Sequence, residues 1–297
     1  MTTESNQRMT CGIEGLDELL GGGLIPGTLT VVVGSTGIGK TQLGASFSRS
    51  GLQQEGRTGL FYDMTSRGDS QSHHEYCKRM FDWELEDADP EKNPILNHIF
   101  EESISPGDYL HVFKHSGRRV LRSDVGDEDW RVWKQEMVSK LNTTIAYFYS
   151  NFVRGTRRVI IDGIEPAAKA SESIQLDLFE YIYHQILHKE YDWVARDLFR
   201  QSYREFAEQI EAGAYNHQEV GSMLLYTAHE PLLEQLITRP LDEGDLLTNA
   251  NTVIFLGKVK DGLEMKRAIY IAKHRGSACS DAITPYTITN KGIEFLK

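Results

Sequence analysis

The residues best suited to chemistry are the run GSTGIGKT at positions 34–41. This run fits the spacing G-x-x-x-x-G-K-[ST], in which glycines let the backbone curl until successive N–H groups converge on phosphate oxygens. Lys40 adds a point charge for the β- and γ-phosphates, and Thr41 adds a hydroxyl for the shell of a Mg²⁺ ion. The predicted nucleotide-binding residues are Gly34, Ser35, Thr36, Gly37, Ile38, Gly39, Lys40 and Thr41.

A second carboxylate is needed near such a loop to hold Mg²⁺ through water. The segment RRVIID has the required form, an apolar strand that ends in an acid, and it ends at Asp162. We therefore expect Thr41 and Asp162 to form the metal side of the site. Glu165 follows three residues later, and the sequence does not fix its direction.

Two further clusters of side chains give weaker signals, and each has an alternative interpretation. His73 and Cys77 in SHHEYC have the i, i+4 spacing of two ligands on a helix, but no second cluster completes a tetrahedral site, so a polar helix face is favoured. The basic cluster Arg118, Arg119 and Arg122 could contact phosphate, an acidic partner or water.

The elements that must position these residues alternate between short β-type runs and helical stretches, which predicts an α/β fold with a mostly parallel sheet flanked by helices. A short helix and a triple-glycine turn in IEGLDELLGGG precede the first strand. The last two strands are expected to form a C-terminal antiparallel segment. The expected strands lie at about 28–33, 58–63, 108–113, 157–162, 221–227, 252–257, 265–273 and 284–289.

No linker or repeat divides the chain, so residues 1–297 are expected to form a single domain with enlarged intervals at about 66–156 and 166–220. The first interval contains an acidic stretch, ELEDADPEKNP, which reads as a solvated loop. In the second, Leu178, Ile182, Ile186 and Leu187 are spaced to face one side of a helix. Such a stripe indicates a core face, with a docking face for a partner as the alternative.

Composition excludes several classes of protein. Hydrophobic residues make up 40% of the 297 residues and charged residues 25%, which excludes wholesale disorder. The apolar runs are far shorter than the ~18 residues that cross a bilayer, so no membrane span is expected. Three scattered cysteines and an N-terminus without an apolar core favour the cytoplasm. The net charge of −11 repels polyanions and disfavours nucleic acid as a partner.

Three segments resemble the KaiC-like branch of the RecA/RadA superfamily of P-loop ATPases. They are TCGIEGLDELLGGGLIPGTLTVVVGSTGIGKT, RRVIIDGIEP and IAKHRGSACSDAITPYTITNKGIEF. The resemblance implies a single RecA-type core that binds ATP and Mg²⁺ at interfaces between subunits, often six in a ring. It therefore implies a homo-oligomer.

The resemblance also implies roles for residues outside the P-loop. The family's Lys-x-Arg pair, which reaches the γ-phosphate held by the neighbouring subunit, matches Lys273 and Arg275. A trans-acting Arg would stabilise charge on the transferring phosphoryl oxygens. In YTAHE, Thr227 and His229 match polar residues that sense the γ-phosphate, with structural hydrogen bonding as the alternative.

One departure from the family concerns hydrolysis. The family has Glu after the second strand to polarise the attacking water, and this sequence has Thr65 and Ser66 there. Asp63 and Asp69 are close in sequence, but a shift of two residues along a strand moves a side chain by about 6–7 Å. We therefore expect ATP hydrolysis to be slow. A turnover assay must establish whether the protein is an ATPase.

Three functions follow from these features. The leading one is an ATP-binding, slowly hydrolysing oligomeric switch of the KaiC/RecA type that acts on protein partners. The first alternative, a DNA-binding recombination or repair ATPase, is disfavoured because residues 228–250 carry five acids against Arg239 alone. The second alternative is a nucleotide-gated scaffold without significant hydrolysis, which the missing Glu favours.

Overall fold

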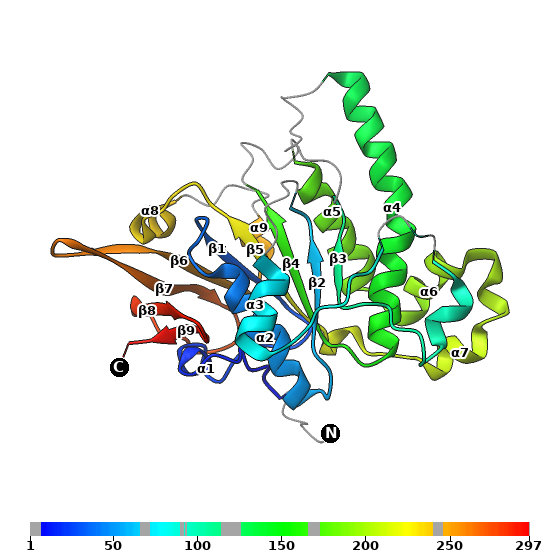
Figure 1. The fold of residues 1–297 in the computed structure, drawn as a ribbon, viewed down its shortest axis with the longest axis horizontal. Helices are drawn as coiled ribbons and strands as arrows, with labels where there is room; N and C mark the ends of the chain where they lie inside the picture. The colour runs from blue at the N-terminus through cyan, green and yellow to red at the C-terminus, as the bar shows by residue number, and fades with distance from the viewer. Residues whose placement is uncertain are drawn as a thin grey trace.

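The computed structural model describes residues 7–65, 72–89, 92, 94–113, 126–165, 173–239 and 246–296. Nine strands in this part of the chain form one sheet, in the order β3-β2-β4-β5-β1-β6-β7-β8-β9 (Figure 1). The strands are β1 (Leu29–Gly34), β2 (Leu60–Asp63), β3 (Tyr109–His111), β4 (Arg158–Ile164), β5 (Gly221–Thr227), β6 (Thr252–Asp261), β7 (Glu264–His274), β8 (Thr284–Thr289) and β9 (Gly292–Phe295).

The sheet is parallel from β3 through β6 and antiparallel from β6 through β9. The predicted mostly parallel sheet with an antiparallel C-terminal segment is therefore confirmed. All eight predicted strands are present, with ends that differ by a few residues. The last strand, β9, is an addition that the sequence analysis did not anticipate.

Helices cover both faces of the sheet (Figure 1). The α-helices are α1 (Leu16–Leu19), α2 (Lys40–Gln54), α3 (Ser72–Phe81), α4 (Asp127–Val153), α5 (Ile174–Ile182), α6 (Tyr191–Phe199), α7 (Ala207–Ala212), α8 (Leu233–Thr238) and α9 (Leu246–Asn249). Short 3₁₀ or π turns lie at η1 (Leu96–Phe100), η4 (Tyr183–Leu187), η5 (Arg200–Arg204) and η6 (His217–Glu219). In the described part of the chain, no helix is both long and apolar enough to cross a membrane.

The period of two along each strand divides the buried residues into two cores. On β1, Val31 and Val33 belong to one cluster and Val32 to the other. The first core is shared with α4, α5 and α6, and the second with α2, α3 and the N-terminal segment. The predicted stripe of Leu178, Ile182, Ile186 and Leu187 is buried in the first core, as expected of a core face.

Strand order decides which residues meet at the carboxyl edge of the parallel strands. β5 lies between β1 and β4. The P-loop that follows β1 and Asp162 on β4 are therefore separated by one strand, which ends at Thr227. The crevice at this edge, where β1 has neighbours from both sides, is the usual ligand site of an open α/β sheet.

Candidate nucleotide-binding site

The P-loop connects β1 to α2 as the sequence predicts. Gly39, with φ of 110°, has a backbone conformation that side chains with a Cβ rarely adopt, so the loop needs glycine there. The Lys40 ammonium donates to the carbonyl oxygens of Gly34 at 2.9 Å and Ser35 at 3.0 Å. The Tyr286 hydroxyl, on β8, donates to the carbonyl of Ile38 at 2.6 Å and so braces the loop from the antiparallel segment.

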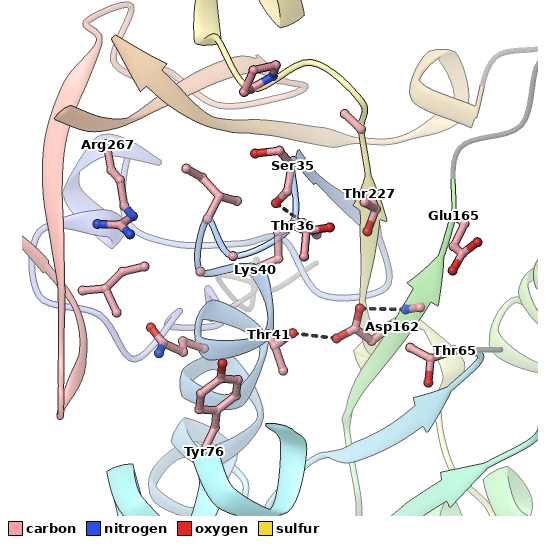
Figure 2. A pocket seen from close by; sticks show the side chains of 18 of the residues that line it. Ser35, Thr36, Lys40, Thr41, Thr65, Tyr76, Asp162, Glu165, Thr227 and Arg267 are labelled. Carbon is pink, nitrogen blue, oxygen red and sulfur yellow. Dashed lines mark hydrogen bonds between the residues drawn. The ribbon is translucent and has the colours of Figure 1, made fainter. Parts of the chain in front are cut away.

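Thr41 and Asp162 meet at the base of the loop. The Thr41 hydroxyl donates to Asp162 Oδ2 at 2.8 Å, although 121 positions separate the two residues in the sequence (Figure 2). A hydroxyl and a carboxylate at this point, beside a phosphate-binding loop, match the oxygen donors that Mg²⁺ prefers. The two side chains therefore fit a magnesium ion, which Thr41 and Asp162 would hold.

His73, on α3, also contacts this carboxylate. Its Nε2 lies 3.0 Å from Asp162 Oδ2 and its Nδ1 lies 3.6 Å from Asp63 Oδ2. The Tyr109 hydroxyl donates to the same Asp63 oxygen at 2.5 Å. An ionised carboxylate only accepts hydrogen bonds, so the proton between His73 and Asp162 belongs to Nε2. His73 thus lies between Asp63, the last residue of β2, and Asp162, which is opposite it on β4.

These contacts set the charge of the site. Burial alone would raise the pKa of Asp162, but hydrogen bonds from His73 and Thr41 and the positive charge of Lys40 outweigh it and lower that pKa. Burial lowers the pKa of Lys40, and the Asp162 carboxylate opposes this shift. Asp162 is therefore held as a carboxylate, the form that can hold a cation.

A cavity of about 1010 Å³ opens above the P-loop. Its walls include most of the residues predicted to bind nucleotide: Ser35 through Thr41, Thr227 and His229. Asp162, predicted for the metal side, is also in the wall. Gly34 contributes the carbonyl that holds Lys40. The strand order thus brings these predicted residues together around one volume. Further wall residues are Thr65, His73, Tyr76, Glu165, Lys258 and Arg267.

Lys273 and Arg275 lie elsewhere in the same chain. β6 pairs Thr252 with Thr30 of β1 and with His274 of β7, and it pairs Leu256 with Gly34. The Lys-x-Arg pair therefore lies at the edge of the sheet opposite the P-loop. There Lys273 and Arg275 donate to backbone carbonyls, both of them to that of Thr248, at 2.7 and 3.1 Å.

Sequence reasoning missed several of the wall residues. Lys258 and Arg267 are paired across the β6–β7 hairpin, which places both cations over the P-loop (Figure 2 labels Arg267). Nothing in the sequence distinguishes them from other strand charges. His73 was noticed only as a weak metal ligand, and Cys77 beside it is buried. Within the described residues, no group of three or more His, Cys, Asp or Glu is arranged to hold a metal ion.

Some predicted positions cannot be placed. Ser66, Asp69 and the basic cluster Arg118, Arg119 and Arg122 lie outside the described residues. Thr65, where the family's Glu was expected, lies at the cavity wall. Asp63, considered above as a substitute, is fully buried and accepts from the backbone N–H of Thr65 at 2.8 Å and from Tyr109. It is therefore occupied as a structural acceptor.

Comparisons with known proteins identify a family and relatives of this chain. A family model described as KaiC ATPase matches residues 9–191. The circadian clock oscillator protein KaiC of Thermostichus vulcanus is 24% identical over 292 residues, 98% of this chain and 42% of that protein. KaiC of Synechococcus elongatus is 22% identical over 290 residues. The chain spans about 42% of the length of these curated relatives.

A solved structure is similar over almost the whole chain. The crystal structure of a KaiC-like protein from the archaeon Pyrococcus horikoshii OT3 has a TM-score of 0.52 and 19% sequence identity. The match covers 98% of this chain and 99% of that one. At this identity the likeness shows the fold, and the predicted RecA-type α/β fold is confirmed.

Proposed function

The chain belongs to the KaiC ATPase family, and from this premise we propose that it binds ATP with Mg²⁺ and hydrolyses it slowly as an assembly of several copies. The assembly acts as a nucleotide-dependent switch on protein partners. The net charge of −11 supports protein rather than nucleic acid as the partner, because a surface of that sign repels a phosphate backbone.

One observation carries the proposal. The P-loop and Asp162 are already in contact, through the hydrogen bond from the Thr41 hydroxyl to the Asp162 carboxylate. Lys40 would place its charge on the β- and γ-phosphates, and the N–H groups from Gly37 to Thr41 would bind phosphate oxygens at the N-terminus of α2. Thr227 and His229, at the end of β5, would contact the γ-phosphate from the opposite wall. Bound Mg²⁺ would neutralise charge on the phosphates, and Thr41 and Asp162 are the residues that would hold it.

The position of the second pair of cations supports assembly. Lys273 and Arg275 lie at the edge of the sheet opposite their own P-loop. Cations there lie away from the P-loop of their own chain, which supports a role at a nucleotide that another copy presents. We therefore place the nucleotide at an interface between subunits, with Arg275 as the group that stabilises charge in the transition state.

The test is calorimetric titration with ATP and Mg²⁺, combined with measurement of phosphate release. Lys40→Ala should abolish tight ATP binding, because it removes the cation aimed at the β- and γ-phosphates. Lys291→Ala, which removes an exposed lysine in the turn between β8 and β9, is the matched control and should leave binding unchanged. Equal ATP affinity in wild type and Lys40→Ala would contradict the proposed site.

A further inference from the structure

β4 contains an extra residue at the point where it reaches the site. Its register with β5 runs from Ile161 opposite Leu224 to Ile164 opposite Tyr226, which is three steps on β4 against two on β5. Gly163 has φ of 89°, and a Cβ there would lie 2.3 Å from the backbone nitrogen of Thr65. This is a β-bulge that only glycine permits, and bulges of this kind re-aim side chains beside active sites.

The bulge changes which residue of β4 reaches the level of Thr65. On the other side of β4, Asp63 is opposite Asp162, and the Met64 N–H donates to the Asp162 carbonyl at 2.8 Å. Two residues beyond that pair, a regular strand would bring Ile164 beside Thr65. With one extra residue in β4, the register moves on by one, and Glu165, the residue after β4, is in the cavity wall together with Thr65.

The Gln175 side chain fixes this arrangement. In a regular parallel ladder, the carbonyl of Met64 would accept a hydrogen bond directly from a backbone N–H of the neighbouring strand. Here the Gln175 side-chain amide lies between the Met64 carbonyl and the Glu165 N–H. Its Nε2 donates to the carbonyls of Met64 and Gly163, both at 2.7 Å, and its Oε1 accepts from the Glu165 N–H at 3.1 Å. Gln175 is buried, so the ends of β2 and β4 are joined through a fixed side chain.

Glu165 therefore reaches the cavity from the strand next to Thr65. Both residues are in its wall (Figure 2). Of the described residues in that wall, Asp162 and Glu165 are the only carboxylates. Asp162 already accepts hydrogen bonds from Thr41 and His73. Asp162 belongs to the proposed metal side, and Glu165 is the second acid of this wall.

We propose that Glu165, the residue after β4, is the catalytic carboxylate of this slow ATPase, and that it acts from a different strand end than the family's Glu, which follows the second strand. This inference rests on the proposed function. In the reaction, the oxygen of a water forms a bond to the γ-phosphorus as the bond from that phosphorus to the bridging oxygen breaks. ADP leaves with the electron pair of the broken bond. Glu165 orients the water, accepts its proton and later releases the proton to solvent.

The test compares Glu165→Gln with wild type in ATP titrations and in phosphate release. The amide has the size of the carboxylate but cannot accept the proton, so turnover should fall by about 10²–10⁴-fold. The ATP affinity should change less than about threefold, because Lys40 and the loop N–H groups remain. Glu234→Gln, on the exposed face of α8, is the control and should hydrolyse ATP at the wild-type rate.

A second variant tests the position of the carboxylate itself. Thr65→Glu combined with Glu165→Gln moves the acid to the neighbouring strand at the same level and should restore turnover at least about tenfold over Glu165→Gln alone. If wild type hydrolyses ATP and Glu165→Gln does so equally fast, the role of Glu165 is wrong while the ATPase stands. If wild type neither binds nor hydrolyses ATP, the proposed function itself is wrong, and the role of Glu165 with it.

Discussion

His73 and His74 are neighbours in the sequence but pair with different carboxylates. His73 is buried between Asp162 and Asp63, whereas His74 is partly exposed, pairs with Asp87 at 3.1 Å and packs against the Tyr109 ring. A partner that hydrogen-bonds a metal-side carboxylate fixes the direction of that carboxylate. His73 is therefore a positioning residue for Asp162.

We predict that His73→Ala raises the Mg²⁺ concentration needed for half-maximal ATP turnover by about 10–100-fold, the usual cost of losing such a partner. The measurement is a Mg²⁺ titration at saturating ATP. His74→Ala is the matched control and should follow the wild-type curve. Coincident titrations for His73→Ala and wild type would show that Thr41 and Lys40 hold Asp162 in place without the imidazole.

Among single residues, the sequence predicts a role only for those that belong to a local motif. The eight residues of the P-loop form one continuous motif, so their place was readable. SHHEYC has two adjacent histidines, and only the packing of α3 against Phe61, which the His73 ring contacts, decides that the first of them faces inward. Arg267 was missed for the same reason, since its position depends on how the β6–β7 hairpin lies over the loop.

Among the elements, the ends of β2 and β4 depend on one side chain from α5. Gln175→Leu would keep the size of the residue but leave the carbonyls of Met64 and Gly163 and the Glu165 N–H without this partner. A buried group that loses its hydrogen bond costs about 1–3 kcal/mol. We therefore predict that Gln175→Leu lowers the free energy of unfolding by at least about 2 kcal/mol and reduces ATP turnover more than ATP affinity.

The measurements are urea unfolding, ATP titration and phosphate release. Gln42→Leu offers a comparison, because Gln42 is also buried but its side-chain oxygen accepts no hydrogen bond from the described residues. Its substitution should cost less unfolding free energy than Gln175→Leu. If Gln175→Leu lowers stability but hydrolyses ATP at the wild-type rate, the amide stabilises the strand ends without positioning Glu165.

The eight expected strands were readable because their apolar runs are bounded by turn residues, and the parallel arrangement followed from the helices between them. The bulge in β4 could not be predicted in the same way. A glycine inside a strand suggests a bulge, and Gly163 in RRVIIDGIEP is such a glycine. The extra residue becomes evident only from the pairing with β5, so the direction of Glu165 could not be predicted.

Over the whole molecule, the sheet separates two sets of positive charge. Lys40 lies at the carboxyl edge of the parallel strands, while Lys273 and Arg275 lie at the opposite edge. Burial and the neighbouring charge of Arg275 lower the pKa of Lys273, so an approaching anion would be favourable at this pair. Under the proposed function, one chain therefore carries two halves of a site that face in different directions.

This arrangement leads to a test by mixing. Arg275→Ala should bind ATP with near wild-type affinity but turn it over at least about 10³-fold more slowly, as expected for the loss of an arginine acting in trans. Lys40→Ala should be inactive because it cannot hold ATP. In a random one-to-one assembly of the two, about a quarter of the interfaces join an intact P-loop to an intact Arg275. Phosphate release should therefore return to about a quarter of the wild-type rate per subunit, whereas each variant alone stays inactive.

Native mass spectra establish whether mixed assemblies form. Mixed assemblies without restored turnover would contradict the trans role, because half-sites on different copies must complement each other when they meet.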